Sequence, residues 1–212
     1  MPKQVWKGSA VFGPLSPALV SCGDETEQNI LTIGWTGIVN SHPPMTYISV
    51  RPERHSYAII DRTGEFVINF PRADQLTGTD YCGVRSGRDE DKAKKCGFTY
   101  APSSQISAPQ IAECPLSLEC RVTERKVLGS HTMFLAEIVA VQADEAYLDA
   151  KGKLDLQKAN LLVYQHGEYF STGKRCGTFG CSVMKKSTAA RKRGKSAPKG
   201  AAQRKKEKHH ET

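Results

Sequence analysis

The sequence has 212 residues, which is enough for one domain with a substantial hydrophobic core. Its formal net charge is +8, but residues 1–184 carry 19 Lys and Arg against 20 Asp and Glu, whereas residues 185–212 carry 11 against 2. The body is therefore about neutral, and the net charge gives no evidence for a basic nucleic-acid groove in it. Any contact of that kind is confined to residues 185–212.

Seven cysteines, an odd number, are scattered along the chain, and the first residues, MPKQVWKGSA, contain no apolar signal-peptide core. Both features favour reduced thiols in the cytoplasm. No Cys-x-x-Cys pair occurs, and four residues separate Cys176 from Cys181 without matching partners, so we expect no metal site. The longest apolar runs, Leu161–Val163 and Phe134–Val141, are too short to span a bilayer, so we expect a soluble protein.

Strand patterns dominate the body, and each is bounded by Gly, Pro, Asn or charged clusters. The expected strands lie within Pro17–Gly23, Ile30–Val39, Met45–Val50, Glu65–Phe70, Leu116–Val122 and Thr132–Val141. Shorter helical patterns over His55–Arg62, Asp74–Tyr81 and Asp89–Cys96 predict peripheral connectors. Because strands and helices do not alternate steadily, the pattern favours an antiparallel barrel over a doubly wound parallel sheet.

The stretch Asn29–Gly37, NILTIGWTG, has a face of small residues on which a flat ligand can lie close to the backbone. Alternation assigns two faces to the strand, one of them apolar and typical of core. The apolar face carries Leu31, Ile33, Trp35 and Val39, and the small, polar face carries Thr32, Gly34 and Thr36. The alternative is an ordinary barrel strand with a glycine at a bend, and the alternation favours a core position for Trp35.

The next segment, SVRPERHS at Ser49–Ser56, runs from a strand through Pro52 into an expected helix start. Helix N-terminal amides and guanidinium groups such as those of Arg51 and Arg54 favour a phosphate monoester. The alternative is a surface turn whose arginines are solvated.

After Met184 the composition shifts to Lys, Arg, Ala, Ser and Gly without apolar periodicity. Such a segment cannot bury enough surface to offset its ordering entropy, so we expect a folded domain over residues 1–184 and a disordered basic tail over residues 185–212. The tail has no aromatic residue, so contact with a nucleic acid would depend on phosphates and on salt.

Together these segments resemble the flavin reductase-like family, specifically the flavoredoxin branch of the FMN-binding split barrels. The resemblance covers nearly all of residues 8–184 and extends to FVINFP, DYCGVRSGRDEDK, CPLSLECRV, GSHTMFLAEIVAV and YQHGEYFSTGKRCGTFGCSV. It implies a mainly β fold, an antiparallel Greek-key split β-barrel with peripheral helices. It also implies a homodimer that holds FMN noncovalently near the subunit boundary.

The resemblance further implies which residues contact the cofactor. The isoalloxazine ring is expected along Asn29, Thr32, Ile33, Gly34, Trp35 and Thr36. The phosphate is expected at Ser49, Arg51, Arg54 and Ser56, and Val50 and His55 of the same segment are also expected to contact the cofactor. Further approach to the cofactor is expected from Asn69, Cys82, Gly83, Ser86, Gly87 and Lys92.

His131 falls where the family often has a histidine near the exposed flavin face, and it is our candidate catalytic residue, although a lone histidine that opens a strand is more often structural. Cys82 has no resolving cysteine at a motif distance, so we interpret it as a packing residue in a cofactor loop. The resemblance places Tyr169, Phe170 and Lys174 close to the flavin or across the dimer interface, and the sequence does not separate these options.

The function implied is that of an oxidoreductase moving electrons from NAD(P)H, or from a redox protein such as a ferredoxin, through bound FMN to an acceptor. The sequence carries no nucleophile motif, Walker loop or G-x-G-x-x-G fingerprint that would indicate another chemistry. The alternative is a polyanion- or nucleic-acid-binding protein that works through its basic tail, with the barrel as a scaffold.

Overall fold

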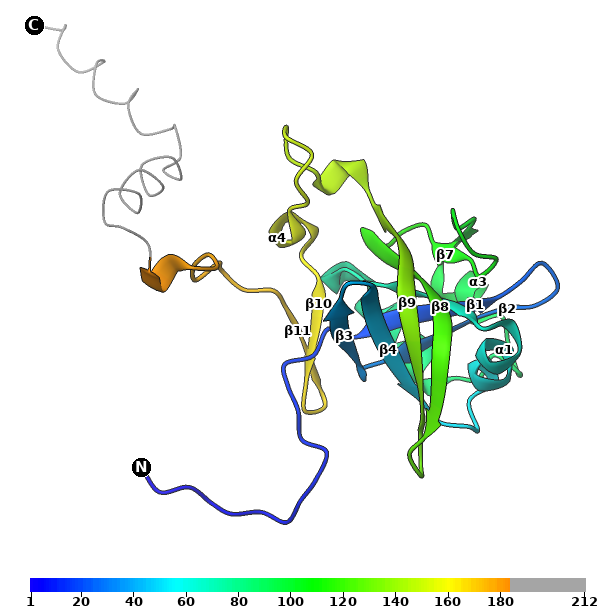
Figure 1. The fold of residues 1–212 in the computed structure, drawn as a ribbon, viewed down its shortest axis with the longest axis horizontal. Coiled ribbons are helices and arrows are strands. Elements are labelled where there is room, and N and C mark those ends of the chain that lie inside the picture. Colours follow the sequence, from blue (N-terminus) through cyan, green and yellow to red (C-terminus); the bar gives the residue numbers. More distant parts are fainter. Residues whose placement is uncertain (184–212) are drawn as a thin grey trace, which may run out of the picture. The chain divides into compact units, whose positions relative to one another are not determined.

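Seven strands of the described chain form one antiparallel sheet in the order β2-β1-β5-β8-β9-β4-β3 (Figure 1). The computed structural model describes residues 1–183. The predicted tail, and the boundary predicted after residue 184, lie outside or at the edge of that range. The strands are β1 (Ala18–Gly23), β2 (Gln28–Ile33), β3 (Thr36–Ser41), β4 (Pro44–Val50), β5 (Glu65–Asn69), β8 (Leu116–Val127) and β9 (Thr132–Ala143).

The two outer strands of this order, β2 and β3, follow each other in the chain with only Gly34 and Trp35 between them. The chain leaves its pairing with β1 after Ile33 and begins to pair with β4 at Thr36. At the junction the N–H of Ser49 donates to the Trp35 carbonyl at 3.0 Å. The sheet therefore curls until its two outer strands meet, without a ladder between them, and the predicted split β-barrel is confirmed.

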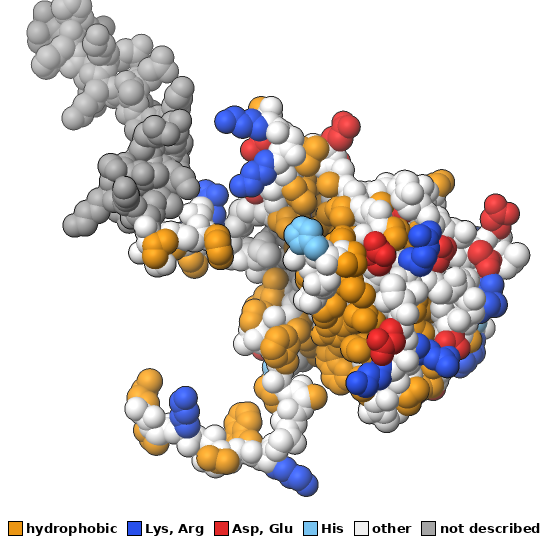
Figure 2. Space-filling view, in the orientation of Figure 1, with side chains coloured by type: hydrophobic (Ala, Val, Ile, Leu, Met, Phe, Trp, Pro, Cys, Tyr) orange, Lys and Arg blue, Asp and Glu red, His pale blue; other side chains and the backbone are white. Residues whose placement is uncertain are grey.

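The single strand predicted over Ile30–Val39 is wrong in one respect, because the structure divides it at Gly34 and Trp35. Leu31 and Ile33 are buried as expected, but 52% of Val39 and 66% of the adjacent Ile38 are exposed. The reason is that β3 is an outer strand whose side chains have no covering layer. Hydrophobic side chains accordingly gather on the surface over β3, β4 and β9 (Figure 2).

The barrel interior is filled by buried apolar side chains from strands throughout the sheet. Its largest fully buried members include Phe66 of β5 and Phe134 of β9. Helix α1 (His55–Thr63) covers one side, buries Ile59 and Ile60, and ends at Gly64, which has a left-handed φ of 68°. This core fixes the strands whose ends carry the polar residues described below.

The other predicted helices are present with shifted bounds. The pattern over Asp74–Tyr81 becomes a 3-10 turn, η1 (Ala73–Gln75), followed by α2 (Leu76–Val84). The pattern over Asp89–Cys96 yields only α3 (Lys92–Cys96), because the Asp91 carboxylate accepts from the Lys94 N–H at 3.0 Å and so caps the helix there.

The remaining elements are short. They are β6 (Tyr100–Ala101), β7 (Gln110–Ile111), η2 (Glu145–Tyr147), α4 (Leu156–Ala159), β10 (Leu162–Gln165), β11 (Glu168–Ser171) and η3 (Cys181–Val183). Residues 1–173 form one compact unit, and η3 belongs to a second unit that begins at Lys174. Within residues 1–183, helices of the length and apolar character needed to cross a bilayer are absent.

Asn69 lies at the end of β5 and is fully buried. Its amide nitrogen donates to the Leu19 carbonyl and the Ser21 hydroxyl, both at 2.9 Å. Its amide oxygen accepts from the Ile111 N–H at 2.9 Å and from the Ser117 hydroxyl at 2.8 Å. The side chain is thus saturated inside the fold, and this placement does not support the approach to a cofactor predicted from the sequence.

Replacing Asn69 by Ala should lower the free energy of unfolding by about 2–3 kcal/mol, since the buried Ile111 N–H and Ser117 hydroxyl lose their acceptor. Urea denaturation followed by circular dichroism measures the loss. Asn40→Ala is the control, because Asn40 donates to the Pro43 carbonyl at an exposed turn, where the loss should stay below about 1 kcal/mol. Equal, small losses at both positions would contradict the structural role of Asn69.

Candidate functional site

Three cavities run along β2 and the Gly34–Trp35 break, and neighbouring cavities share walls. The cationic cavity, about 360 Å³, shares Leu31 and Arg54 with the central cavity, about 180 Å³. The central cavity shares Gly34 and Trp35 with the tyrosine cavity, about 330 Å³. The cavities therefore form one groove that follows a single strand, with cationic side chains at one end and two tyrosines at the other.

The cationic cavity concentrates charge that the body as a whole does not show. Five cationic side chains line it together with one carboxylate, that of Glu53. Net charge over residues 1–184 concealed this asymmetry, because the compensating acids lie elsewhere on the fold. The cationic residues are Arg51, Arg54, Arg85, Arg88 and Lys92.

Lys92 is the most buried of these cations, with 3% of its surface exposed. Its ammonium donates to the carbonyls of Cys82 and Arg85, both at 3.1 Å, and it forms no ion pair with a carboxylate in the described part of the chain. Burial lowers the pKa of Lys92. A buried ammonium that lacks a counter-ion favours the binding of an anion beside it.

The C-terminal end of α2 holds two of the cations in place. Arg54 donates to the Gly83 carbonyl at 2.7 Å, next to the carbonyl that accepts from Lys92. Carbonyl groups at a helix C-terminus carry partial negative charge, which stabilises cations there. The end of α2 therefore orients a guanidinium and an ammonium toward the same cavity.

The opposite wall is the N-terminus of α1. Its N-cap residue, Arg54, makes no side-chain cap; the Tyr57 N–H donates to the Arg54 carbonyl at 3.0 Å, and the His55 and Ser56 amides can donate to an anion. The Ser56 hydroxyl accepts from the Asn29 amide nitrogen at 2.7 Å. The backbone at Gly87 comes so close that an added Cβ would lie 2.1 Å from the Asn29 amide oxygen, so a larger residue would displace this amide.

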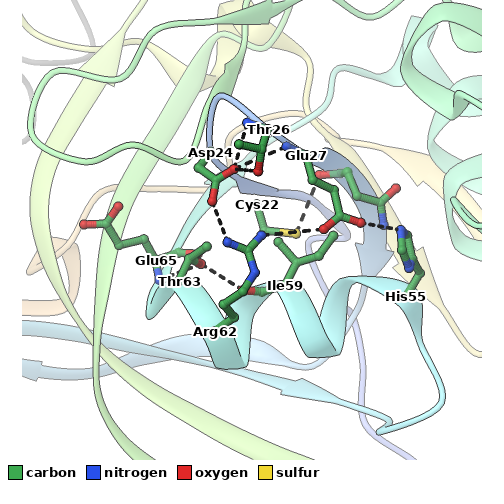
Figure 3. A network of polar contacts seen from close by, with 10 residues as sticks. Cys22, Asp24, Thr26, Glu27, His55, Ile59, Arg62, Thr63 and Glu65 are labelled. Atoms are coloured by element: carbon green, nitrogen blue, oxygen red, sulfur yellow. Dashed lines mark hydrogen bonds and ion pairs between the residues drawn. The ribbon is translucent and has the colours of Figure 1, made fainter.

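Helix α1 is held in position by ion pairs with the turn between β1 and β2 (Figure 3). Arg62 lies 2.6 Å from the Asp24 carboxylate and 3.5 Å from that of Glu27. Hydrogen bonds from Thr26 and Arg62 lower the pKa of Asp24. Glu27 also lies 3.1 Å from the imidazole of His55, which was expected to contact the cofactor, and this contact holds the start of the helix.

The central cavity contains a stacked pair, Trp35 and His131, whose ring centroids lie 4.6 Å apart at 40°. Trp35 is 43% exposed, so its predicted core position is wrong; it sits at the chain break between β2 and β3, where alternation no longer holds. The hydroxyl of Ser130 lies 2.9 Å from Nδ1 of His131. Burial, with a smaller contribution from Arg51, lowers the pKa of His131 and favours the neutral imidazole.

The tyrosine cavity lies between the Gly34–Trp35 break, the end of α2 and the β10–β11 hairpin. Tyr164 and Tyr169 meet edge to face at 5.1 Å, and the Tyr169 hydroxyl donates to Asp80 at 3.0 Å. Burial, followed by Asp80, raises the pKa of Tyr169 to about 12, so the phenol stays protonated and able to donate.

Most residues predicted from the sequence line this groove, although no contact with a cofactor is thereby tested. Those that line it are Asn29, Thr32, Ile33, Gly34, Trp35, Ser49, Val50, Arg51, Arg54, His55, Ser56, Gly83, Ser86, Gly87, Lys92 and His131. Asn69, Thr36 and Cys82 do not. The Thr36 hydroxyl donates to the Tyr47 carbonyl at 2.6 Å instead.

Cys82 belongs to α2 and is fully buried, which agrees with the predicted packing role, although it lies in a helix and not in a loop. The sequence has no resolving cysteine at a motif distance from Cys82, but the fold brings another thiol close to it. The sulfur of Cys96 lies 4.0 Å from that of Cys82. Sequence spacing concealed the pair because two short helices fold back on each other.

Sequence reasoning also missed Arg85, Arg88, Asp80 and Tyr164. The two arginines lie in the DYCGVRSGRDEDK run that carries part of the resemblance, so their charge was a usable signal. Asp80 and Tyr164 come from segments that only the fold brings together, and nothing local marks them.

Residues 14–173 match the family model described as the flavin reductase like domain. The chain belongs to the flavin reductase-like family. It is similar to the solved flavoredoxin of Desulfovibrio vulgaris (Miyazaki F), with 27% identity, a TM-score of 0.80, and coverage of 86% of this chain and 100% of that one. It is also similar to the solved flavoredoxin from Methanosarcina acetivorans, with 31% identity, a TM-score of 0.78, and coverage of 86% of this chain and 100% of that one.

This chain is also similar to a curated protein named NADH-dependent FMN reductase, from Streptomyces nodosus subsp. asukaensis. The two are 24% identical over 135 residues, which is 63% of this chain and 71% of that protein.

The His131 imidazole should titrate below the ordinary histidine pKa near 6.5, because burial and Arg51 both disfavour its protonated form. Arg51→Ala should raise the pKa of His131, whereas Glu53→Gln should lower it further, because Glu53 attracts the imidazolium. NMR titration of the imidazole resonances measures all three values. A lower pKa of His131 in Arg51→Ala, or a higher one in Glu53→Gln, would contradict these electrostatic contributions.

Proposed function

We propose that this protein binds FMN noncovalently in the groove along β2 and passes electrons from a donor through it to an acceptor. The observation that carries the proposal is the groove itself, with the buried Lys92 ammonium, which has no carboxylate partner among the described residues, at one end and the half-buried Gly34 toward the other. Similarity to two flavoredoxins and to an FMN reductase supports the same cofactor.

The cationic cavity fits the phosphate of FMN. Lys92 and Arg54 supply charge, and the first turn of α1, with Ser56, supplies hydrogen-bond donors. A phosphate monoester would neutralise the buried Lys92 ammonium, which now has only carbonyl partners. Gly87 approaches Asn29 closely, so a larger residue there would displace the Asn29 amide that donates to Ser56.

The groove beyond the phosphate fits a flat ring. Gly34 presents no side chain, and Thr32 and Ile33 precede it along the strand that both cavities share. Trp35 and His131 lie on the central-cavity side, and the Tyr164–Tyr169 pair lies on the other. Apolar and aromatic walls of this kind exclude water from a bound ring.

Bound FMN supplies the chemistry, because its isoalloxazine ring accepts a hydride or single electrons. The chain's own residues would bind and orient this cofactor. The phosphate cradle fixes the register of the cofactor along β2, and Trp35 limits solvent access to the central cavity. His131, kept neutral, offers a hydrogen bond at that cavity without adding a positive charge.

We further propose that the protein is a homodimer and that its interface includes β3. Ile38 and Val39 of that strand are 66% and 52% exposed, and Val141 of β9 is 58% exposed. A patch of apolar residues at an outer strand with one unpaired edge is typical of a subunit interface (Figure 2).

Replacing Arg51 and Arg54 together by Ala should weaken FMN binding by about 100-fold, because charge-assisted contacts to the phosphate are lost. Riboflavin, which lacks the phosphate, should lose less than about 3-fold. Fluorescence titration of both ligands measures the difference. Arg121→Ala, at an exposed arginine paired with Glu65 outside the groove, is the control. Equal losses for the two ligands would reject the phosphate cradle.

We propose NADH or NADPH as the electron donor, docking at the central cavity. His131→Ala should then lower kcat/KM for the nicotinamide by about 10- to 100-fold and leave the affinity for FMN nearly unchanged. Steady-state oxidation followed at the nicotinamide absorption band measures this. His42→Ala, at an exposed histidine in the β3–β4 turn, should have no effect.

The opposite outcome would assign a different donor. If the FMN-loaded protein oxidised neither nicotinamide but was rapidly reduced by a reduced ferredoxin, the nicotinamide assignment would be rejected, and the protein would be an electron carrier fed by a redox protein.

A further inference from the structure

The thiols of Cys82 and Cys96 meet between α2 and α3. Their sulfurs are 4.0 Å apart although the residues are 14 positions apart in the chain. Cys82 is fully buried, and Cys96, the last residue of α3, is half-buried and so within reach of a small oxidant. We propose that these two cysteines are a redox pair that closes to a disulfide when hydrogen peroxide oxidises Cys96.

The packing of the two helices holds the pair together. A Cβ added at Gly78 of α2 would lie 3.1 Å from the Cys96 Cβ and 2.9 Å from the Phe98 ring, so α3 rests directly on the α2 backbone. Cys82 and Ala93 lie in the same buried cluster, with Cys96 packed against it. Rotation of two side chains and a small helix movement bring the sulfurs to the bonding distance of about 2.05 Å.

The reaction balances with peroxide as the only oxidant. The Cys96 thiolate attacks a peroxide oxygen, the O–O bond breaks, and hydroxide leaves and takes up a proton to form water, which gives Cys96 sulfenic acid. The Cys82 sulfur then attacks the Cys96 sulfur, the S–S bond forms, the S–O bond breaks, and a second water leaves with the Cys82 proton. Two thiols lose two electrons, and one peroxide gains them.

The environment of the two thiols makes their oxidation slow near neutral pH. Burial raises the pKa of Cys82 to about 12 and also raises the pKa of Cys96. Only a small fraction of either thiol is ionised near neutral pH, so the rate of pairing should rise by about tenfold per pH unit below these values. A rate that is independent of pH between neutral and mildly alkaline conditions would contradict attack by these thiolates.

The cross-link would fasten α3 to α2 at the base of the cationic cavity. Lys92 lies on α3 and donates to carbonyls at the end of α2, so the disulfide restrains both partners of these bonds. As a consequence that rests on the proposed function, the oxidised protein should release FMN several-fold more slowly. Stopped-flow release measures this separately, and an unchanged rate would reject the coupling while leaving the disulfide assignment intact.

The test uses the full chain with the exposed thiols removed by Cys176→Ser and Cys181→Ser. After treatment with hydrogen peroxide, intact mass should fall by two hydrogen atoms, and peptide mapping should join Cys82 to Cys96. Cys96→Ser should abolish the cross-link. Cys114→Ala, at a buried cysteine of the same cluster, should retain it and controls for general loss of packing.

The disulfide should raise the midpoint of thermal unfolding by about 5–10 °C, because it closes a loop of about 15 residues, and a reductant should reverse the increase. Oxygen addition at Cys96 without a cross-link, or a disulfide that maps to other cysteines, would overturn the proposal.

Discussion

The two-residue passage from β2 to β3 is the constraint on which the rest of the structure depends. These strands end the hydrogen-bonded order of the sheet, yet Gly34 and Trp35 alone connect them. The sheet must curl to bring its outer strands together, and no ladder seals the seam. Backbone that would be paired inside a closed barrel therefore faces a groove, and both the central and the tyrosine cavities open there.

The second constraint is electrostatic. The peptide carbonyls at the end of α2 hold Arg54 and Lys92, while the N-terminus of α1 lies across the same cavity. One helix end positions cations, and another presents amides, so both favour an anion at one place. Strand β2 connects the Gly34–Trp35 break to this anion site. The groove therefore fits a long ligand that has one charged end and one flat end.

The sheet and the segment with two arginines before α1 could be predicted from the sequence, because each depends on a local pattern. Strand composition located the sheet, and SVRPERHS at Ser49–Ser56 combined a strand end, a helix start and two arginines in one segment. Period-two alternation failed at Trp35, since a break of two residues resets the faces. The internal hydrogen bonds of Asn69 could not be predicted, because Leu19, Ser21, Ile111 and Ser117 come from segments distant in the chain.

The net charge concealed the cationic cavity, and spacing along the chain concealed the Cys82–Cys96 contact. Arg51, Arg85 and Lys92 are balanced in a residue count by acids that lie elsewhere, and only folding gathers the cations. The two cysteines meet because α2 and α3 are short and pack back to back around Gly78. Properties that depend on contacts between distant segments require the fold, whereas those carried by one segment do not.

The central claim is that this groove holds a flavin mononucleotide. A visible absorption spectrum of the purified protein, before and after incubation with excess FMN, tests it most directly when any compound released on denaturation is identified by mass. The account predicts a yellow protein that releases FMN. A protein that is colourless, and remains so after the incubation and removal of free cofactor, would contradict it.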